Sequence, residues 1–249
     1  MGPATGGVDG PAGGRLIVAM GGGGWQMEPD NPLLDDHVLG LARARSGRDR
    51  PRICLIPTAG ADHDGAIADF ERLFASRAEP RVLRLFVRTD EDLREVVLGQ
   101  DAIFVAGGNT ANLLAIWRLH GLDSVMRDAW NGGVVMAGMS AGAICWFEAC
   151  TTDSFGPELQ PLAGGLAFLD GSFIPHYNGE AQRRPLFNRL VADGSLPAGY
   201  GVDDGAALVF DGTALREVVS SGPEAAAYRV ELADGAVREM RLPVRQLRG

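Results

Sequence analysis

The stretch that decides the fold reads VVMAGMSAGAICWFE, at residues 134–148. An apolar run is followed by the pentapeptide GMSAG, centred on Ser140, and then by a helix-compatible stretch, 143–148. This G-x-S-x-G pattern is typical of a buried strand that turns sharply into a helix and carries a nucleophilic serine at the turn. The pattern therefore predicts an exposed Ser140 hydroxyl, and backbone N–H groups at the helix start that are free to hold an oxyanion.

The same pentapeptide is also compatible with a purely structural turn in which Ser140 caps the helix. A second glycine loop, AGGNT at residues 106–110, favours the functional interpretation because it too ends an apolar strand and precedes a helix. Ligands of open parallel sheets bind beyond the carboxyl ends of the strands. We therefore expect an N–H of Gly107 or Gly108 to face Ser140 and, with the N–H of Ala141, to form an oxyanion hole.

Short apolar runs alternate with helical stripes up to about residue 150, which is typical of right-handed crossover units. The predicted strands are 15–20, 52–57, 81–86, 101–106 and 134–138, and the predicted helices are 33–44, 67–75 and 113–119. We therefore predict a doubly wound α/β fold, with a mainly parallel sheet and helices on both faces.

From Tyr200 onward, short β-like runs separated by Gly, Asp and Pro predict extra antiparallel strands appended to one edge of the sheet. These strands either cover that edge or offer it to a second copy, so a monomer and a homodimer are both compatible with the sequence. Residues 15–249 are expected to form a single α/β hydrolase domain. Residues 1–14, rich in Gly, Pro and Ala, are expected to be a disordered tail.

The composition excludes several classes of function. The formal charge of -9 opposes binding to nucleic acid or to an anionic membrane. The three cysteines have no metal-ligand spacing, and no export signal is recognised, so we expect a cytoplasmic protein without metal or cofactor. The four glycines at 21–24 and the GGNT loop match neither G-x-x-x-x-G-K-[ST] nor G-x-G-x-x-G with a suitable acid downstream. The chain also has no lysine, so a phosphate site is disfavoured.

A serine becomes a strong nucleophile only when a base takes its proton, and the chain has four histidines. His37 lies in a predicted helix, His63 in a polar loop and His120 at a helix end. His176 differs, because it follows the apolar run 172–175 and should lie at a strand end beside the elbow. We interpret His176 as the base, with a structural histidine as the alternative.

The third catalytic group should be a carboxylate that orients the imidazole and stabilises its charged form. Glu148, Asp153, Asp203 and Asp204 are candidates. Spacing along the chain does not choose among them, because such triads assemble in several chain orders.

Five motifs together resemble peptidase E and its relatives, the S51 serine peptidases, which share a fold with class I glutamine amidotransferases. They are GGNT (107–110), GMSAGA (138–143), TTDS (151–154), PHYN (175–178) and GVDDGAAL (201–208). The resemblance implies that Ser140 is the nucleophile and His176 the base. It also implies a dipeptidase that acts after an N-terminal aspartyl-like residue.

By the same resemblance the acid is Asp153, because peptidase E has an aspartate just after a similar Thr-Thr pair. This sequence is one residue shorter there, so an alternative alignment puts Ser154 in that position. Glu148 or Asp204 would then be the acid.

Peptidase E reads the substrate aspartate with an arginine beyond the catalytic histidine, and Arg183 and Arg184 lie in that region. Arg183 is the candidate, with two solvated arginines as the alternative. Asn109 and Thr110 of the GGNT loop are expected to contact a small peptide substrate. An esterase or exopeptidase of another specificity, and a catalytically silent binding protein, remain alternatives to the dipeptidase.

Overall fold

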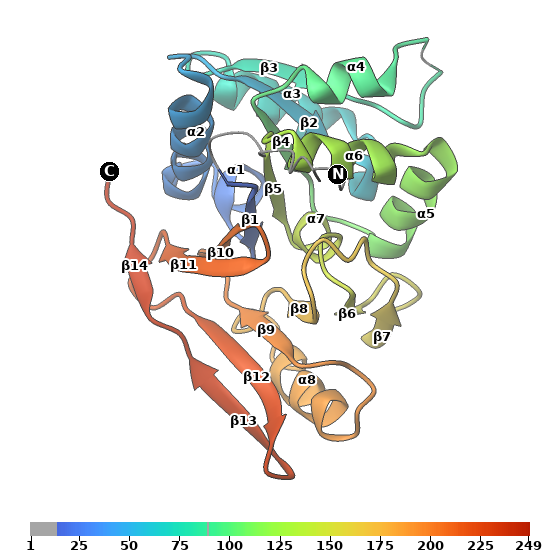
Figure 1. Ribbon diagram of the computed structural model, residues 1–249, viewed down its shortest axis with the longest axis vertical. Coiled ribbons are helices and arrows are strands. Elements are labelled where there is room, and N and C mark those ends of the chain that lie inside the picture. The colour runs from blue at the N-terminus through green and yellow to red at the C-terminus, as the bar shows by residue number, and fades with distance from the viewer. Residues whose placement is uncertain (1–13, 89) are drawn as a thin grey trace, which may run out of the picture.

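The main sheet has eight strands in the order β14-β11-β10-β1-β5-β4-β2-β3 (Figure 1). The computed structural model describes residues 14–88 and 90–249, so the predicted tail, apart from Gly14, lies outside the described residues. The strands of this sheet are β1 Leu16–Met20, β2 Arg52–Ile56, β3 Glu79–Val82, β4 Ala102–Val105, β5 Val135–Met139, β10 Ala206–Asp211, β11 Ala214–Ser220 and β14 Val244–Gln246.

Helices cover both faces of the parallel half of this sheet, in which β1, β5, β4, β2 and β3 run in one direction. The helical segments are α1 Gly24–Met27, α2 Leu33–Ser46, η1 Thr58–Gly60, α3 Asp64–Phe74, α4 Leu93–Leu98, α5 Thr110–His120, α6 Leu122–Asn131, α7 Ala141–Ile144 and α8 Arg183–Ala192. Among the described residues, no helix is both long enough and apolar enough to cross a bilayer.

The two faces of β1 pack into separate cores. Ile17 and Ala19 belong to the core that α4, α5 and α6 cover, whereas Leu16, Val18 and Met20 belong to the core under α2 and α3. Successive side chains of a strand point to opposite faces, so a continuous apolar run is what a sheet buried on both sides requires. The doubly wound fold is confirmed.

A second sheet, which the sequence did not indicate, has six strands in the order β13-β12-β9-β8-β6-β7. Its strands are β6 Ala149–Thr152, β7 Gln160–Ala163, β8 Ser172–Ile174, β9 Gly199–Val202, β12 Ala227–Ala233 and β13 Ala236–Arg241. It lies in the lower part of Figure 1, with α8 packed against it. Phe147 joins the sheets, since its ring stacks on Phe173 of β8 and meets the edge of Phe210 of β10.

The strands after Tyr200 therefore divide between two sheets instead of extending one edge. β10 pairs antiparallel with β1 and continues the main sheet through β11, as predicted. β9 pairs parallel with β8, and β12 and β13 follow it into the second sheet. Alternation along a strand predicts its buried face but does not identify its partner, which explains the error.

Two predicted elements end earlier than expected. The strand predicted at 81–86 ends at Val82, because the Asp62 carboxylate accepts the N–H groups of Leu85 and Phe86 at 2.7 and 2.8 Å and takes them out of the ladder. The helix predicted at 143–148 is only α7. Beyond α7 the chain turns, and it buries Trp146 against Trp117 of α5 and Phe147 between the sheets.

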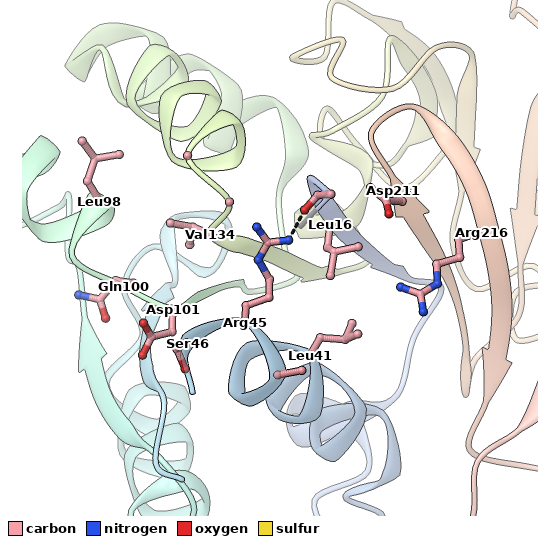
Figure 2. A pocket seen from close by; sticks show the side chains of 14 residues that line it. Leu16, Leu41, Arg45, Ser46, Leu98, Gln100, Asp101, Val134, Asp211 and Arg216 are labelled. Carbon is pink, nitrogen blue, oxygen red and sulfur yellow. Dashed lines mark hydrogen bonds between the residues drawn. The ribbon is translucent and has the colours of Figure 1, made fainter. Parts of the chain in front are cut away.

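A surface pocket of about 630 Å³ lies near the amino ends of the parallel strands (Figure 2). Leu16, Asp101 and Val134 line it, and Arg45 donates a hydrogen bond to the Gly14 carbonyl there. Ser140 follows the carboxyl end of β5, at the opposite end of the sheet. This pocket is therefore separate from the predicted catalytic site.

One buried carboxyl group lies under the loop that follows β1. Asp35, in the first turn of α2, is 1% exposed, and its Oδ1 has no hydrogen-bond partner within residues 14–88 and 90–249. A Cβ on Gly24 would lie 3.1 Å from that oxygen. Burial raises the pKa of Asp35 to about 7, because removing the carboxylate from water disfavours its charged form.

Replacing Asp35 should make stability less dependent on pH. In the unfolded chain its pKa is near the ordinary value of 3.8, so the folded state holds the proton more tightly. The resulting stabilisation is complete below about pH 4 and is lost as the pH rises to about 7. Asp35→Asn should therefore gain stability relative to wild type between pH 4 and pH 8, by at most about 4 kcal/mol. Urea unfolding at both pH values measures this, and an equal difference at both would contradict it.

Candidate active site

Ser140 occupies the predicted sharp turn between β5 and α7. Its backbone has φ 53° and ψ −116°, a conformation that a non-glycine residue seldom adopts. A Cβ on Gly138 would lie 2.1 Å from the Gly142 carbonyl oxygen, and one on Gly142 would lie 2.2 Å from the Val105 oxygen. Both flanking glycines are therefore required sterically, as the G-x-S-x-G pattern predicts.

The structure brings Ser140 and His176 together. His176 lies just beyond β8, and its Nε2 is 2.9 Å from Ser140 Oγ. Its Nδ1 is 2.6 Å from Oδ1 of Asp204, which lies in the connection between β9 and β10. The three side chains come from the main sheet, the second sheet and the link between the sheets. They form the hydrogen-bonded order of hydroxyl, imidazole and carboxylate that a catalytic triad requires.

Asp153 does not occupy the position of the acid, which corrects the assignment implied by the resemblance. It is exposed in the turn after β6, and among the described residues its carboxylate has no hydrogen bond to His176. The Ser154 hydroxyl accepts the Ala111 N–H at 3.1 Å, which holds this segment against the start of α5. Asp204, one of the alternatives, makes the contact instead.

The remaining carboxylate candidates have structural partners. Glu148 accepts the Gly171 N–H at 2.6 Å. Asp203 accepts the Ala226 N–H at 3.0 Å, and burial raises the pKa of this carboxyl group. Among the described residues neither carboxylate forms a hydrogen bond with the imidazole, although Asp203 precedes Asp204 directly in the sequence. The position of each aspartate along the loop therefore decides that Asp204, and not Asp203, reaches His176.

The end of β1 and the glycine loop after it hold the segments of Ser140, His176 and Asp204, a role that the sequence analysis missed. Three consecutive carbonyls each accept one N–H: Met20 from Ser140 (3.2 Å), Gly21 from His176 (3.1 Å) and Gly22 from Gly205 (3.1 Å). The available signal was the run of four glycines at 21–24 directly after a buried strand, since glycine lets other backbone segments approach closely.

Gly22 lies directly against the Asp204–His176 pair. A Cβ at this position would lie 1.9 Å from Asp204 Oδ1 and 2.9 Å from His176 Nδ1. Asn178, of the PHYN motif, contributes from the other side, because its Oδ1 accepts the Asp204 N–H at 3.0 Å. Gly179 is equally constrained, since a Cβ there would lie 2.3 Å from Asp204 Oδ2.

The two backbone donors predicted for the oxyanion hole lie in the loop after β4 and at the start of α7. The loop at Gly107 packs against the elbow, where a Cβ on Gly107 would lie 3.3 Å from the Met139 oxygen. Gly108 has φ 143°, which suits glycine. Within residues 14–88 and 90–249, no acceptor is found for the N–H of Gly108 or for that of Ala141. Both remain free to bind a ligand oxygen.

Asn109 and Thr110 have structural positions. The Asn109 Oδ1 accepts the Asn112 N–H at 2.9 Å and caps α5, while its Nδ2 donates to the Ser154 carbonyl at 3.0 Å. Thr110 is buried in the first turn of α5. The Asn109 contacts join the GGNT loop to the TTDS segment. Contact of Asn109 and Thr110 with a substrate stays a prediction.

Arg183 and Arg184 are both paired with carboxylates. Arg183 is 4% exposed, with its Nε 3.0 Å from Glu180 Oε2 and its guanidinium near the Thr151 carbonyl. Arg184 forms an ion pair with Glu239. The predicted role of Arg183 in reading an acidic side chain is therefore not supported, because its charge is already balanced within the protein.

Comparison with known proteins places the chain in a family. The model of peptidase family S51 matches residues 17–218. The chain belongs to peptidase family S51. The peptidase YgaJ of Bacillus subtilis (strain 168), described as uncharacterised, is 49% identical over 94% of this chain and 99% of its own length. Peptidase E of Shewanella denitrificans is 30% identical over 53% of this chain and 60% of its own length.

Solved structures agree on the fold of this S51 peptidase. A crystal structure of a peptidase from an acI-B1 Actinobacterium superimposes with a TM-score of 0.65 over 92% of this chain and 94% of its own, at 18% identity. A putative peptidase E from Listeria monocytogenes EGD-e gives 0.55 over 82% and 96%, at 17% identity. Identity this low supports the shared fold only.

Gly22→Ala should separate catalysis from folding. The added methyl group collides with Asp204 and His176, so we expect kcat/KM for peptide hydrolysis to fall by about 100-fold or more. Gly40→Ala is the matched control, because a Cβ at this exposed α2 position meets nothing within 4 Å. Alanine is favoured over glycine in a helix, so this control should keep full activity and gain up to about 1 kcal/mol. Equal activity of the two variants would contradict the assigned role of Gly22.

Proposed function

We propose that this S51 peptidase is a serine peptidase that uses Ser140, His176 and Asp204. The observation that carries the proposal is the pair of contacts on one imidazole: Nε2 at 2.9 Å from the Ser140 hydroxyl and Nδ1 at 2.6 Å from the Asp204 carboxylate. An imidazole that donates through Nδ1 to a carboxylate presents Nε2 as an acceptor. It is then in the tautomer that takes the serine proton.

The proposed reaction is acyl transfer to water. Ser140 Oγ attacks the scissile carbonyl while its proton passes to His176 Nε2, and Asp204 stabilises the resulting imidazolium. The N–H groups of Gly108 and Ala141 hold the oxyanion. The C–N bond then breaks as His176 protonates the leaving amine. Water, deprotonated by His176, next attacks the acyl-enzyme and releases the acid and free Ser140.

We propose short peptides as substrates, with cleavage after the N-terminal residue and no requirement for aspartate there. The names of the relatives support a peptidase of the peptidase E type. The ion pairs of Arg183 with Glu180 and of Arg184 with Glu239 argue against an acidic side chain, because binding one would require an existing pair to break.

A panel of X-Leu dipeptides tests this specificity. Ala-Leu and Met-Leu should be hydrolysed at least as fast as Asp-Leu, measured as kcat/KM by release of leucine. A preference for Asp-Leu of about tenfold or more, equivalent to 1.4 kcal/mol, would show that one of the paired arginines is available after all. Simple esters in the same panel separate a peptidase from an esterase.

Two acidic residues provide a matched test of the triad. Asp204→Asn should reduce kcat by about 10⁴, because the imidazole then loses the partner that sets its tautomer, whereas Asp153→Asn should stay within about twofold of wild type. Ser140→Ala should abolish turnover and labelling by a fluorophosphonate, with an unchanged melting temperature. Full activity in Asp204→Asn would exclude Asp204 as the acid. A large loss in Asp153→Asn would restore Asp153 to that role.

A further inference from the structure

Gln26 makes an unusual long-range contact with the loop that carries the proposed oxyanion donor. It lies in α1, the short helix after the glycine loop, and its side chain is exposed. Its Oε1 accepts the Gly107 N–H at 2.9 Å, and its Nε2 lies 3.5 Å from the Gly107 carbonyl oxygen. One side-chain amide therefore contacts both polar groups of a single residue 81 positions away.

Those two contacts bear on the direction of the Gly108 N–H. The Gly107 carbonyl and the Gly108 N–H belong to the same planar peptide, so turning one turns the other. Both flanking residues are glycines, whose backbone dihedrals meet little steric resistance. The peptide itself therefore does not fix the direction of the Gly108 N–H, so contacts from outside the peptide have to do so.

Neighbouring contacts show that the loop is held at both ends. Beyond Gly108, the Asn109 N–H donates to the Ala59 carbonyl at 2.8 Å. A Cβ on Gly108 would lie 2.3 Å from that same oxygen, so the loop runs close against it. The Gln26 side of the loop is anchored through Trp25, which is 8% exposed and meets the edge of the Phe70 ring at 5.2 Å.

We propose that Gln26 is a positioning residue that orients the Gly107–Gly108 peptide and so keeps the Gly108 N–H aimed at the oxyanion. This inference rests on the proposed function, because an oxyanion forms only if Ser140 attacks a carbonyl. Gln26 acts through the loop and contacts no reacting atom. Gln26 also links the two glycine loops. The loop after β1 contacts the segments of the triad, and α1, which follows that loop, contacts the loop that carries the proposed donor.

The expected effect of removing Gln26 lies in kcat. Negative charge develops on the carbonyl oxygen in the transition state, so a misaligned donor weakens transition-state binding more than ground-state binding. Complete loss of an oxyanion donor costs about 10² to 10³ in kcat. For a donor that is still present but no longer held, we expect a loss of about tenfold to 100-fold, with KM within about twofold of wild type.

Gln26→Met removes both polar contacts at nearly constant side-chain length, and Gln26→Glu keeps the acceptor but loses the donor. Gln246→Met is the matched control, because Gln246 is an exposed glutamine in the edge strand β14. Both Gln26 variants should lose kcat, and a peptide aldehyde, which binds Ser140 as a hemiacetal oxyanion, should bind them more weakly by the same factor as kcat/KM falls. The control should match wild type, and thermal unfolding checks that each variant is folded.

The outcomes separate this inference from the proposed function. A folded Gln26→Met enzyme with wild-type kcat, or with only a raised KM, would overturn the positioning role and leave the triad intact. A fall in kcat without a matching loss of aldehyde affinity would overturn it as well, because a merely structural role would not weaken binding of the oxyanion mimic. Wild-type protein without Ser140-dependent turnover would overturn the proposed function itself, and with it this inference.

Discussion

The three backbone hydrogen bonds at the end of β1 are the constraint on which the site depends. Carbonyls of Met20, Gly21 and Gly22 receive N–H groups from the segments of Ser140, His176 and Asp204. β1 itself is held between β5 and β10, so its end is fixed by the centre of the main sheet. Because these three segments come from different parts of the chain, they meet only where both sheets converge on this loop.

Strain accompanies this convergence. Ser140 and His176 both have positive φ, at 53° and 50°, where side chains with a Cβ are disfavoured. Such conformations cost on the order of 1 to 3 kcal/mol each and persist where surrounding contacts enforce them. Here the bonds to Met20 and Gly21 supply that enforcement. The glycine loop therefore offsets the backbone cost of presenting the hydroxyl and the imidazole to each other.

The parallel core, the elbow and His176 could be predicted from the sequence because each has a local pattern: an apolar run, a G-x-S-x-G turn or a histidine directly after a strand. Asp204 could not be chosen over Asp153, because pairing of β9 with β8, and not local sequence, brings its loop to the imidazole. Arg183 shows the same limit. Its burial against Glu180 depends on how α8 packs on the second sheet.

The most direct test of the account is proton NMR of protein labelled with ¹⁵N in its four histidines. A histidine Nδ1–H bonded to a carboxylate at 2.6 Å should give a strongly deshielded resonance that exchanges slowly with water, and it should disappear in an Asp204→Ala variant. Persistence of that resonance without Asp204, or its absence from the wild type, would contradict the hydrogen bond between His176 and Asp204 on which the account depends.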